Sequence, residues 1–124
     1  MCGIFGYSGT KDIKQILVEG LSRLEYRGYD SWGVAIANNQ EIIVEKQVGR
    51  IPDANEVHID LDTETQSAIW QTGIAHTRWA THGGVTHVNA HPHLASDGKF
   101  ALAQNGIVEN YQELRDELKE KALN

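Results

Sequence analysis

The sequence predicts an α+β fold, and two patterns carry this prediction. From Ile13 to Leu24 the apolar residues recur at offsets of 3, 4, 7, 8 and 11, which places them on one face of a helix. Residues 32–38 and 41–48 are rich in β-forming side chains and are joined by a short polar link, so they predict a β-hairpin. With 124 residues, the chain is long enough for one domain with a buried core.

The segments around this helix complete the first half of the chain. Residues 2–8 are predicted to form a strand. Thr10 or Asp12 then caps the helix, because either side chain can accept a hydrogen bond from a free backbone N–H of the first turn. The helix is expected to end near Arg27, since the glycine that follows adopts a terminating conformation at low cost. Residues 50–67 are polar and acidic and give no clear prediction.

The second half is predicted to contain two further strands and a helix. The strands are expected at 73–78 and 99–104, and the glycine- and histidine-rich residues 79–98 between them form a long ordered loop, which is typical of a functional segment. A helix then begins with Asn110 and Glu113 at the spacing of a capping box. The apolar face of this helix, which no later strand in the sequence covers, consists of Tyr111, Leu114 and Leu118.

Composition argues against several classes of function. The net charge is −6, from 17 acidic and 11 basic residues, and the basic residues form no run that could neutralise nucleic-acid phosphates. No apolar stretch approaches the roughly 20 residues that span a bilayer, and the N-terminus lacks the pattern of a secretory signal. A single cysteine excludes an internal disulfide and fits a reducing compartment, so we expect a cytoplasmic protein that binds neither nucleic acid nor membrane.

Cys2 and the Asn105-Gly106 pair are the first candidates for catalysis. Removal of Met1 would leave a cysteine that carries both a nucleophilic thiol and an α-amine, whose pKa of about 7.7–8.0 suits a general base. The amide of Asn105 and the backbone N–H of Gly106 could donate together to one oxyanion. Taken singly, each feature also has a structural interpretation, because a lone cysteine can be incidental and Asn-Gly is a common turn.

Arg78, Trp79 and the histidines form the second group of candidates. Arginine offers a planar fork that fits a carboxylate, although a solvated Arg78 beside a core Trp79 is the simpler interpretation when the two residues are taken alone. Five of the six histidines lie between positions 76 and 93. His87, His91 and His93 could in principle bind zinc, but a polar loop whose histidines hold neighbouring groups in place explains them with fewer assumptions.

These signals become specific when they are taken together and in order. Five blocks carry a resemblance: Cys-Gly-Ile-Phe-Gly at 2–6, Leu-Glu-Tyr-Arg-Gly-Tyr-Asp-Ser at 24–31, His-Thr-Arg-Trp-Ala-Thr-His-Gly at 76–83, Asn-Ala-His-Pro-His at 89–93 and Asn-Gly-Ile-Val-Glu-Asn-Tyr at 105–111. In this order they closely resemble the glutaminase domain of the isomerizing glutamine–fructose-6-phosphate aminotransferases, which are class II glutamine amidotransferases. The resemblance implies an N-terminal-nucleophile hydrolase fold, an αββα sandwich of antiparallel sheets, of which residues 1–124 are the N-terminal part.

The resemblance also implies a role for each matching residue. Cys2 attacks the side-chain carbonyl of glutamine, Asn105 and the backbone of Gly106 form the oxyanion hole, Arg78 binds the substrate α-carboxylate, and His91 supports the site. Arg27, in another matching block, has a structural role near the site. The loop that closes over glutamine contains Trp79, Thr81, His82 and Gly83.

The resemblance implies glutamine hydrolysis without metal or cofactor, with ammonia delivered to fructose 6-phosphate in the complete, homo-oligomeric enzyme. Three departures qualify it: Gln104 replaces a histidine, the aspartate that holds the glutamine amine lies beyond this sequence, and the sugar isomerase domains are absent. The 124-residue chain by itself is therefore expected to be inactive or nearly so. The alternatives are a truncated, non-catalytic form of the domain and a histidine-rich metal-binding module.

Overall fold

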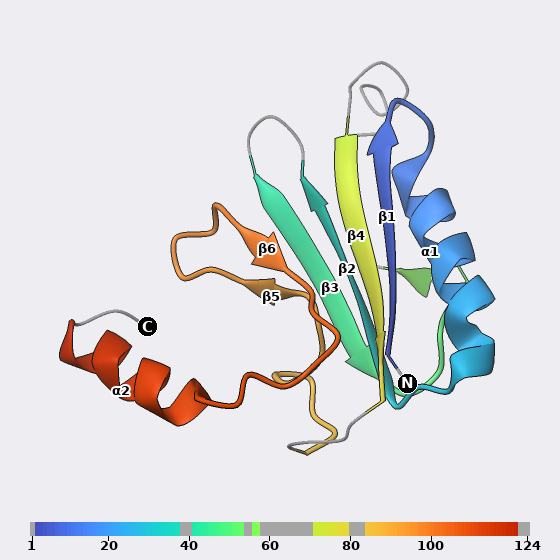
Figure 1. The fold of residues 1–124 in the computed structure, drawn as a ribbon. Helices are drawn as coiled ribbons and strands as arrows, with labels where there is room; N and C mark the ends of the chain where they lie inside the picture. The colour runs from blue at the N-terminus through green and yellow to red at the C-terminus, as the bar shows by residue number, and fades with distance from the viewer. Residues whose placement is uncertain (1, 38–40, 54–55, 58–70, 80–83, 122–124) are drawn as a thin grey trace.

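The computed structural model describes residues 2–37, 41–53, 56–57, 71–79 and 84–121. Among these residues, four strands form one antiparallel sheet in the order β1-β4-β2-β3 (Figure 1). The strands are β1 (Gly3–Gly9), β2 (Ser31–Ala37), β3 (Ile42–Val48) and β4 (Gln71–Arg78). The predicted hairpin is confirmed, since β2 pairs with β3 along its full length.

Helix α1 (Ile13–Leu24) covers one face of this sheet (Figure 1). Of the two predicted caps the structure uses Asp12, whose carboxylate accepts a hydrogen bond from the backbone N–H of Gln15 at 3.3 Å. A short 3₁₀ helix, η1 (Glu25–Arg27), follows and ends at Gly28, where φ is +79° and glycine is favoured. The core between α1 and the sheet includes Ile13, Leu17, Leu21, Trp32, Val34, Ile36 and Ala75.

The long loop contains a short hairpin that the sequence analysis did not predict. Strands β5 (His93–Leu94) and β6 (Ala101–Leu102) pair antiparallel, so the predicted strand at 99–104 is wrong in extent and residues 79–98 are not entirely loop. The turn between the two strands is closed by the backbone N–H of Gly98, which donates to the carbonyl of Ala95 at 2.9 Å. Its φ of +72° explains the glycine at this turn.

Helix α2 (Tyr111–Glu120) lies beyond the β5–β6 hairpin and away from the main sheet (Figure 1). The helix is confirmed but the capping box is not, because the side chain of Asn110 makes no cap hydrogen bond. Its φ of −97° and ψ of 28° lie outside the extended region from which an N-cap side chain reaches the first turn. The apolar face of this helix is exposed, as expected: Tyr111, Leu114 and Leu118 keep 42–45% of their surface in water.

The α+β class with antiparallel sheets is thus confirmed for the described residues. No helix among them is long and apolar enough to cross a membrane.

Candidate active site

Strand β4 separates the hydrophobic core from a polar region on the opposite face of the sheet. Successive side chains of a strand point to opposite faces. Ala75 accordingly lies in the core against α1, whereas its neighbour His76 is fully buried on the other side, against the ring of His91. Arg78, two residues after His76, lies on the same polar face. The strand thereby brings two polar side chains, His76 and Arg78, to one face of the sheet.

The thiol of Cys2 lies where β1 and β4 meet. Cys2 precedes β1, whose first residue, Gly3, pairs with Thr77 of β4. The backbone N–H of Trp79 donates to the Cys2 sulfur at 3.3 Å, and the same sulfur lies 3.7 Å from the carbonyl oxygen of Trp79. The backbone of Trp79 thereby holds the Cys2 sulfur just beyond the end of β4. The thiol is only partly buried and remains accessible to a ligand.

Asn105 contacts the same residue from a distant part of the chain. Its Nδ2 donates to the carbonyl oxygen of Cys2 at 3.0 Å, and its Oδ1 lies 2.9 Å from Nε2 of His76. The next residue, Gly106, has a φ of +149°, which side chains rarely adopt. The structure therefore brings Cys2, Trp79 and Asn105 together, although 77 and 103 residues separate Cys2 from the other two.

His91 supports this arrangement through its ring and its backbone. The ring stacks on that of His76, with 4.4 Å between centroids and 23° between planes, and its Nδ1 accepts a hydrogen bond from the backbone N–H of Gln104 at 3.3 Å. Burial, with a smaller contribution from the nearby His76, lowers the pKa of His91 to about 4. His91 is therefore neutral at neutral pH. Gln104, which replaces the family's histidine, takes part in this contact through its backbone N–H.

The segment that carries His91 is held by β2 and β3. The ammonium group of Lys46 donates to the carbonyl oxygens of Val88 and Ala90, at 3.3 and 3.0 Å. Gly33 allows the chain to approach β2 closely: a Cβ at this position would lie 2.0 Å from the carbonyl oxygen of His91. A glycine in the middle of a strand often marks such a close approach of another backbone.

Gly33→Ala is therefore expected to displace the His91 segment and to destabilise the protein by about 1–3 kcal/mol, the usual cost of overpacking. Gly6→Ala is the matched control, since a Cβ there would have its nearest neighbour, a carbonyl oxygen of Gly73, at an ordinary 3.8 Å. Chemical denaturation of both variants measures the difference. Equal stability of Gly33→Ala and Gly6→Ala would show that the His91 segment does not depend on this approach.

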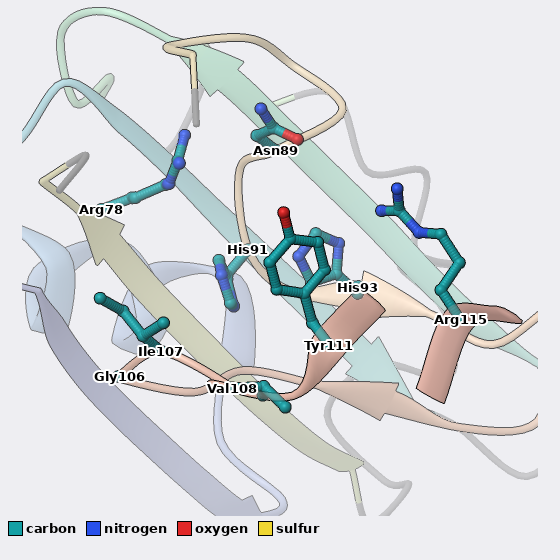
Figure 2. A pocket seen from close by; sticks show the side chains of 9 residues that line it. All are labelled: Arg78, Asn89, His91, His93, Gly106, Ile107, Val108, Tyr111 and Arg115. Carbon is teal, nitrogen blue, oxygen red and sulfur yellow. The ribbon is translucent and has the colours of Figure 1, made fainter. Parts of the chain in front are cut away.

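Arg78 borders an open pocket of about 360 Å³. Its guanidinium donates to the carbonyl oxygen of Gly84 at 2.8 Å and thus fixes the start of the following segment. Figure 2 shows Arg78 on one side of the pocket and Arg115 on the other, with Asn89 and Tyr111 between them. Two guanidinium groups make this pocket suitable for an anion such as a carboxylate. His91, His93, Gly106, Ile107 and Val108 complete its lining.

The structure does not place the side chains of all predicted site residues. Thr81, His82 and Gly83 lie outside the described residues. Arg27 is placed in η1 by its backbone alone. Within the described ranges, no three histidine, cysteine, aspartate or glutamate side chains are arranged to hold a metal ion, so the zinc interpretation of the histidines has no support there.

The sequence patterns above assign no individual role to His76, which the structure places in contact with Asn105. A signal was present, because His76 and Arg78 alternate in the predicted strand and must share a face.

Comparison with known proteins finds relatives that share one name. No family model matches the chain. It is 53% identical over 117 residues to glutamine–fructose-6-phosphate aminotransferase (isomerizing) of Bacillus subtilis (strain 168), and 52% identical over 118 residues to the protein of that name from Listeria monocytogenes. It is also 52% identical over 121 residues to the one from Clostridium acetobutylicum. These alignments cover 94–98% of this chain and 18–19% of the relatives.

These relatives are all named as aminotransferases. The chain is similar over nearly its whole length to isomerizing glutamine–fructose-6-phosphate aminotransferases, and it spans less than a fifth of the length of the curated relatives it matches.

Proposed function

We propose that this chain carries the nucleophile and the oxyanion hole of a glutaminase, which hydrolyses glutamine to glutamate and ammonia. The observation that carries the proposal is the convergence on Cys2: the N–H of Trp79 donates to its sulfur and the amide of Asn105 donates to its carbonyl. The NH₂ group of Asn105 thereby lies beside the nucleophilic residue, where a donor to the oxyanion of an acyl-transfer reaction is needed. The names of the relatives, which include glutamine, support the same reaction.

In this mechanism Cys2 acts after Met1 has been removed. The free α-amine takes the thiol proton, and the sulfur attacks the side-chain carbonyl carbon of glutamine. Asn105 Nδ2 and the Gly106 N–H stabilise the resulting oxyanion. The C–N bond then breaks, the amine returns its proton to the departing ammonia, and a thioester remains. Water attacks the thioester, which releases glutamate and restores the thiol.

Arg78 is the proposed anchor for the substrate α-carboxylate. It lies on the same face of the sheet as the Asn105 contact and borders the open pocket. Its planar fork fits a carboxylate, and a ligand held there would extend its side chain toward Cys2. Four residues of the neighbouring segment are proposed to close over the ligand, namely Trp79, Thr81, His82 and Gly83. Arg27 and His91 are proposed to support the site.

The wider proposal is that residues 1–124 form part of a class II glutamine amidotransferase domain with an N-terminal-nucleophile αββα fold. The antiparallel sheet with α1 on one face is compatible with one half of such a sandwich. The names of the relatives also include fructose 6-phosphate. Ammonia released at Cys2 would accordingly be transferred to this sugar phosphate, to give glucosamine 6-phosphate, by domains outside the chain in a homo-oligomeric enzyme.

The test is covalent labelling of the full-length protein, freed of Met1, with an electrophilic analogue of glutamine such as its diazoketone. Peptide mass spectrometry should find one adduct, on Cys2, and excess glutamine should prevent it. The same analogue without its α-carboxylate serves as a control and should label slowly, because it has no group for Arg78. Labelling that glutamine does not slow would contradict the proposal and favour a non-catalytic form of the domain.

A further inference from the structure

The amide of Asn105 has two different ends, and its role depends on which end faces Cys2. An oxyanion hole needs the NH₂ group, whereas the amide oxygen would repel the developing charge. Here Nδ2 donates to the Cys2 carbonyl at 3.0 Å, and Oδ1 lies 2.9 Å from His76 Nε2. One hydrogen of the NH₂ group binds the Cys2 carbonyl, so the second is left for a ligand. What holds the amide in this orientation therefore matters for the reaction.

His76 can donate at Nε2 in only one neutral tautomer. Burial is the largest influence on His76 and lowers its pKa, although its contacts with Asn105 and the backbone of Gln104 act in the opposite direction. A neutral imidazole carries a single N–H. Its Nδ1 is buried and has no hydrogen-bond partner among the described residues. Buried N–H groups without a partner are rarer than unsatisfied acceptors, so the hydrogen belongs on Nε2.

We propose that His76 is a positioning residue for the glutaminase, which acts by donating Nε2–H to Asn105 and so turning the NH₂ group toward Cys2. The inference rests on the proposed function. The reversed amide would place Oδ1 against the Cys2 carbonyl, which is acceptor against acceptor. It would also require His76 to accept at Nε2 and to bury an unpaired Nδ1–H. Both costs arise together, so the tautomer and the amide orientation stabilise each other.

The stacked ring of His91 adds a second constraint. Its centroid lies 4.4 Å from that of His76, and the contact limits rotation of the His76 ring out of the line to Asn105. The strand supplies the third constraint, because His76 pairs with Ile4 of β1 and Gly33 of β2 in the interior of the sheet. Asn105, the ring of His91 and the sheet thus each restrict where Nε2 of His76 can lie. Such restriction of a positioning group is what pre-organisation requires.

Two amide substitutions test the position of the donor. In the full-length protein freed of Met1, His76→Gln places an amide nitrogen near the position of Nε2, whereas His76→Asn places it near Nδ1. His76→Asn and the ring-retaining His76→Phe are expected to lower kcat for glutamine hydrolysis about 10–100-fold with KM nearly unchanged, because misplacement by about 1 Å has effects of this size. His76→Gln should restore a large part of kcat. Equal activity of the Gln and Asn variants would overturn the proposal.

A double-mutant cycle separates positioning from general packing. If His76 acts through Asn105, His76→Phe should cost little further kcat in an Asn105→Ala background. The inference would be overturned if the kcat losses of the two single variants multiplied in the double variant. It would also be overturned if the lower kcat of His76→Phe were matched by a melting temperature low enough to unfold the protein in the assay. Cys2→Ala in the same series distinguishes the two failures: if that variant still hydrolyses glutamine, the proposed function fails first.

A measurement on the unmodified protein covers the case in which the His76 variants do not fold. Nitrogen-15 NMR of labelled histidine separates the two neutral tautomers by the shifts of the ring nitrogens. His76 is expected to carry its hydrogen on Nε2 and to remain neutral below the usual pKa of about 6.5. A hydrogen on Nδ1 would overturn the proposal whatever the enzyme assays show.

Discussion

In the full-length protein freed of Met1, replacing Cys2 by alanine is expected to abolish glutamine hydrolysis, with a loss of about 10⁴-fold or more in kcat, as for other covalent nucleophiles. The variant keeps the fold, because the only hydrogen-bond contacts of the sulfur in the described structure are with the backbone of Trp79. No other cysteine in the chain could replace it. The measurement is glutamate release per active site, together with the melting temperature.

Cys2→Ser provides the matched control for this variant. A serine hydroxyl has nearly the same shape and can still accept from the Trp79 N–H, but it is a much weaker nucleophile near neutral pH. We expect a native melting temperature with severely reduced turnover. Full activity in Cys2→Ala would mean that a different residue attacks glutamine, whereas unfolding of both variants would point to a structural role for the thiol.

The second large effect is expected at Asn105. Asn105→Ala should lower kcat by roughly 10²–10³, the usual cost of one oxyanion-hole donor, while KM changes much less. Asn105→Asp should be at least as costly, since it keeps the shape but exchanges the NH₂ donor for a charge that repels the oxyanion. Steady-state kinetics of the two variants measures kcat and KM. An active Asn105→Asp would show that this side chain fills space rather than donating to the substrate.

The regular elements near the N-terminus were predictable because each follows from a local pattern. Helix α1 buries Ile13, Leu17 and Leu21 at helical spacing, and β2 and β3 are apolar runs joined by a short link. The hairpin β5–β6 was missed because two-residue strands have no detectable period. Asp97-Gly98 was the available signal for it, since this dipeptide commonly closes hairpins.

The candidate site was predictable by residue type but not by geometry. Cys2, Asn105 and Arg78 each suggested its own chemistry, and each had a plausible structural alternative. Their convergence depends on the pairing of β1 with β4 and on the path of the chain after β6, which no local pattern records. The role of His76 could not be predicted for a related reason, because it depends on the contact with Asn105, which lies 29 residues further along the chain.

Strand order also sets the order in which this site can mature during synthesis and folding. Cys2 leaves the ribosome first, but its sulfur gains the Trp79 N–H only after the chain has closed a loop of 77 residues, and its carbonyl gains Asn105 only after 103. Contacts this distant in sequence form late and slowly. The residues around Cys2 therefore come together only after the segment that follows β6 has docked against β1 and β4.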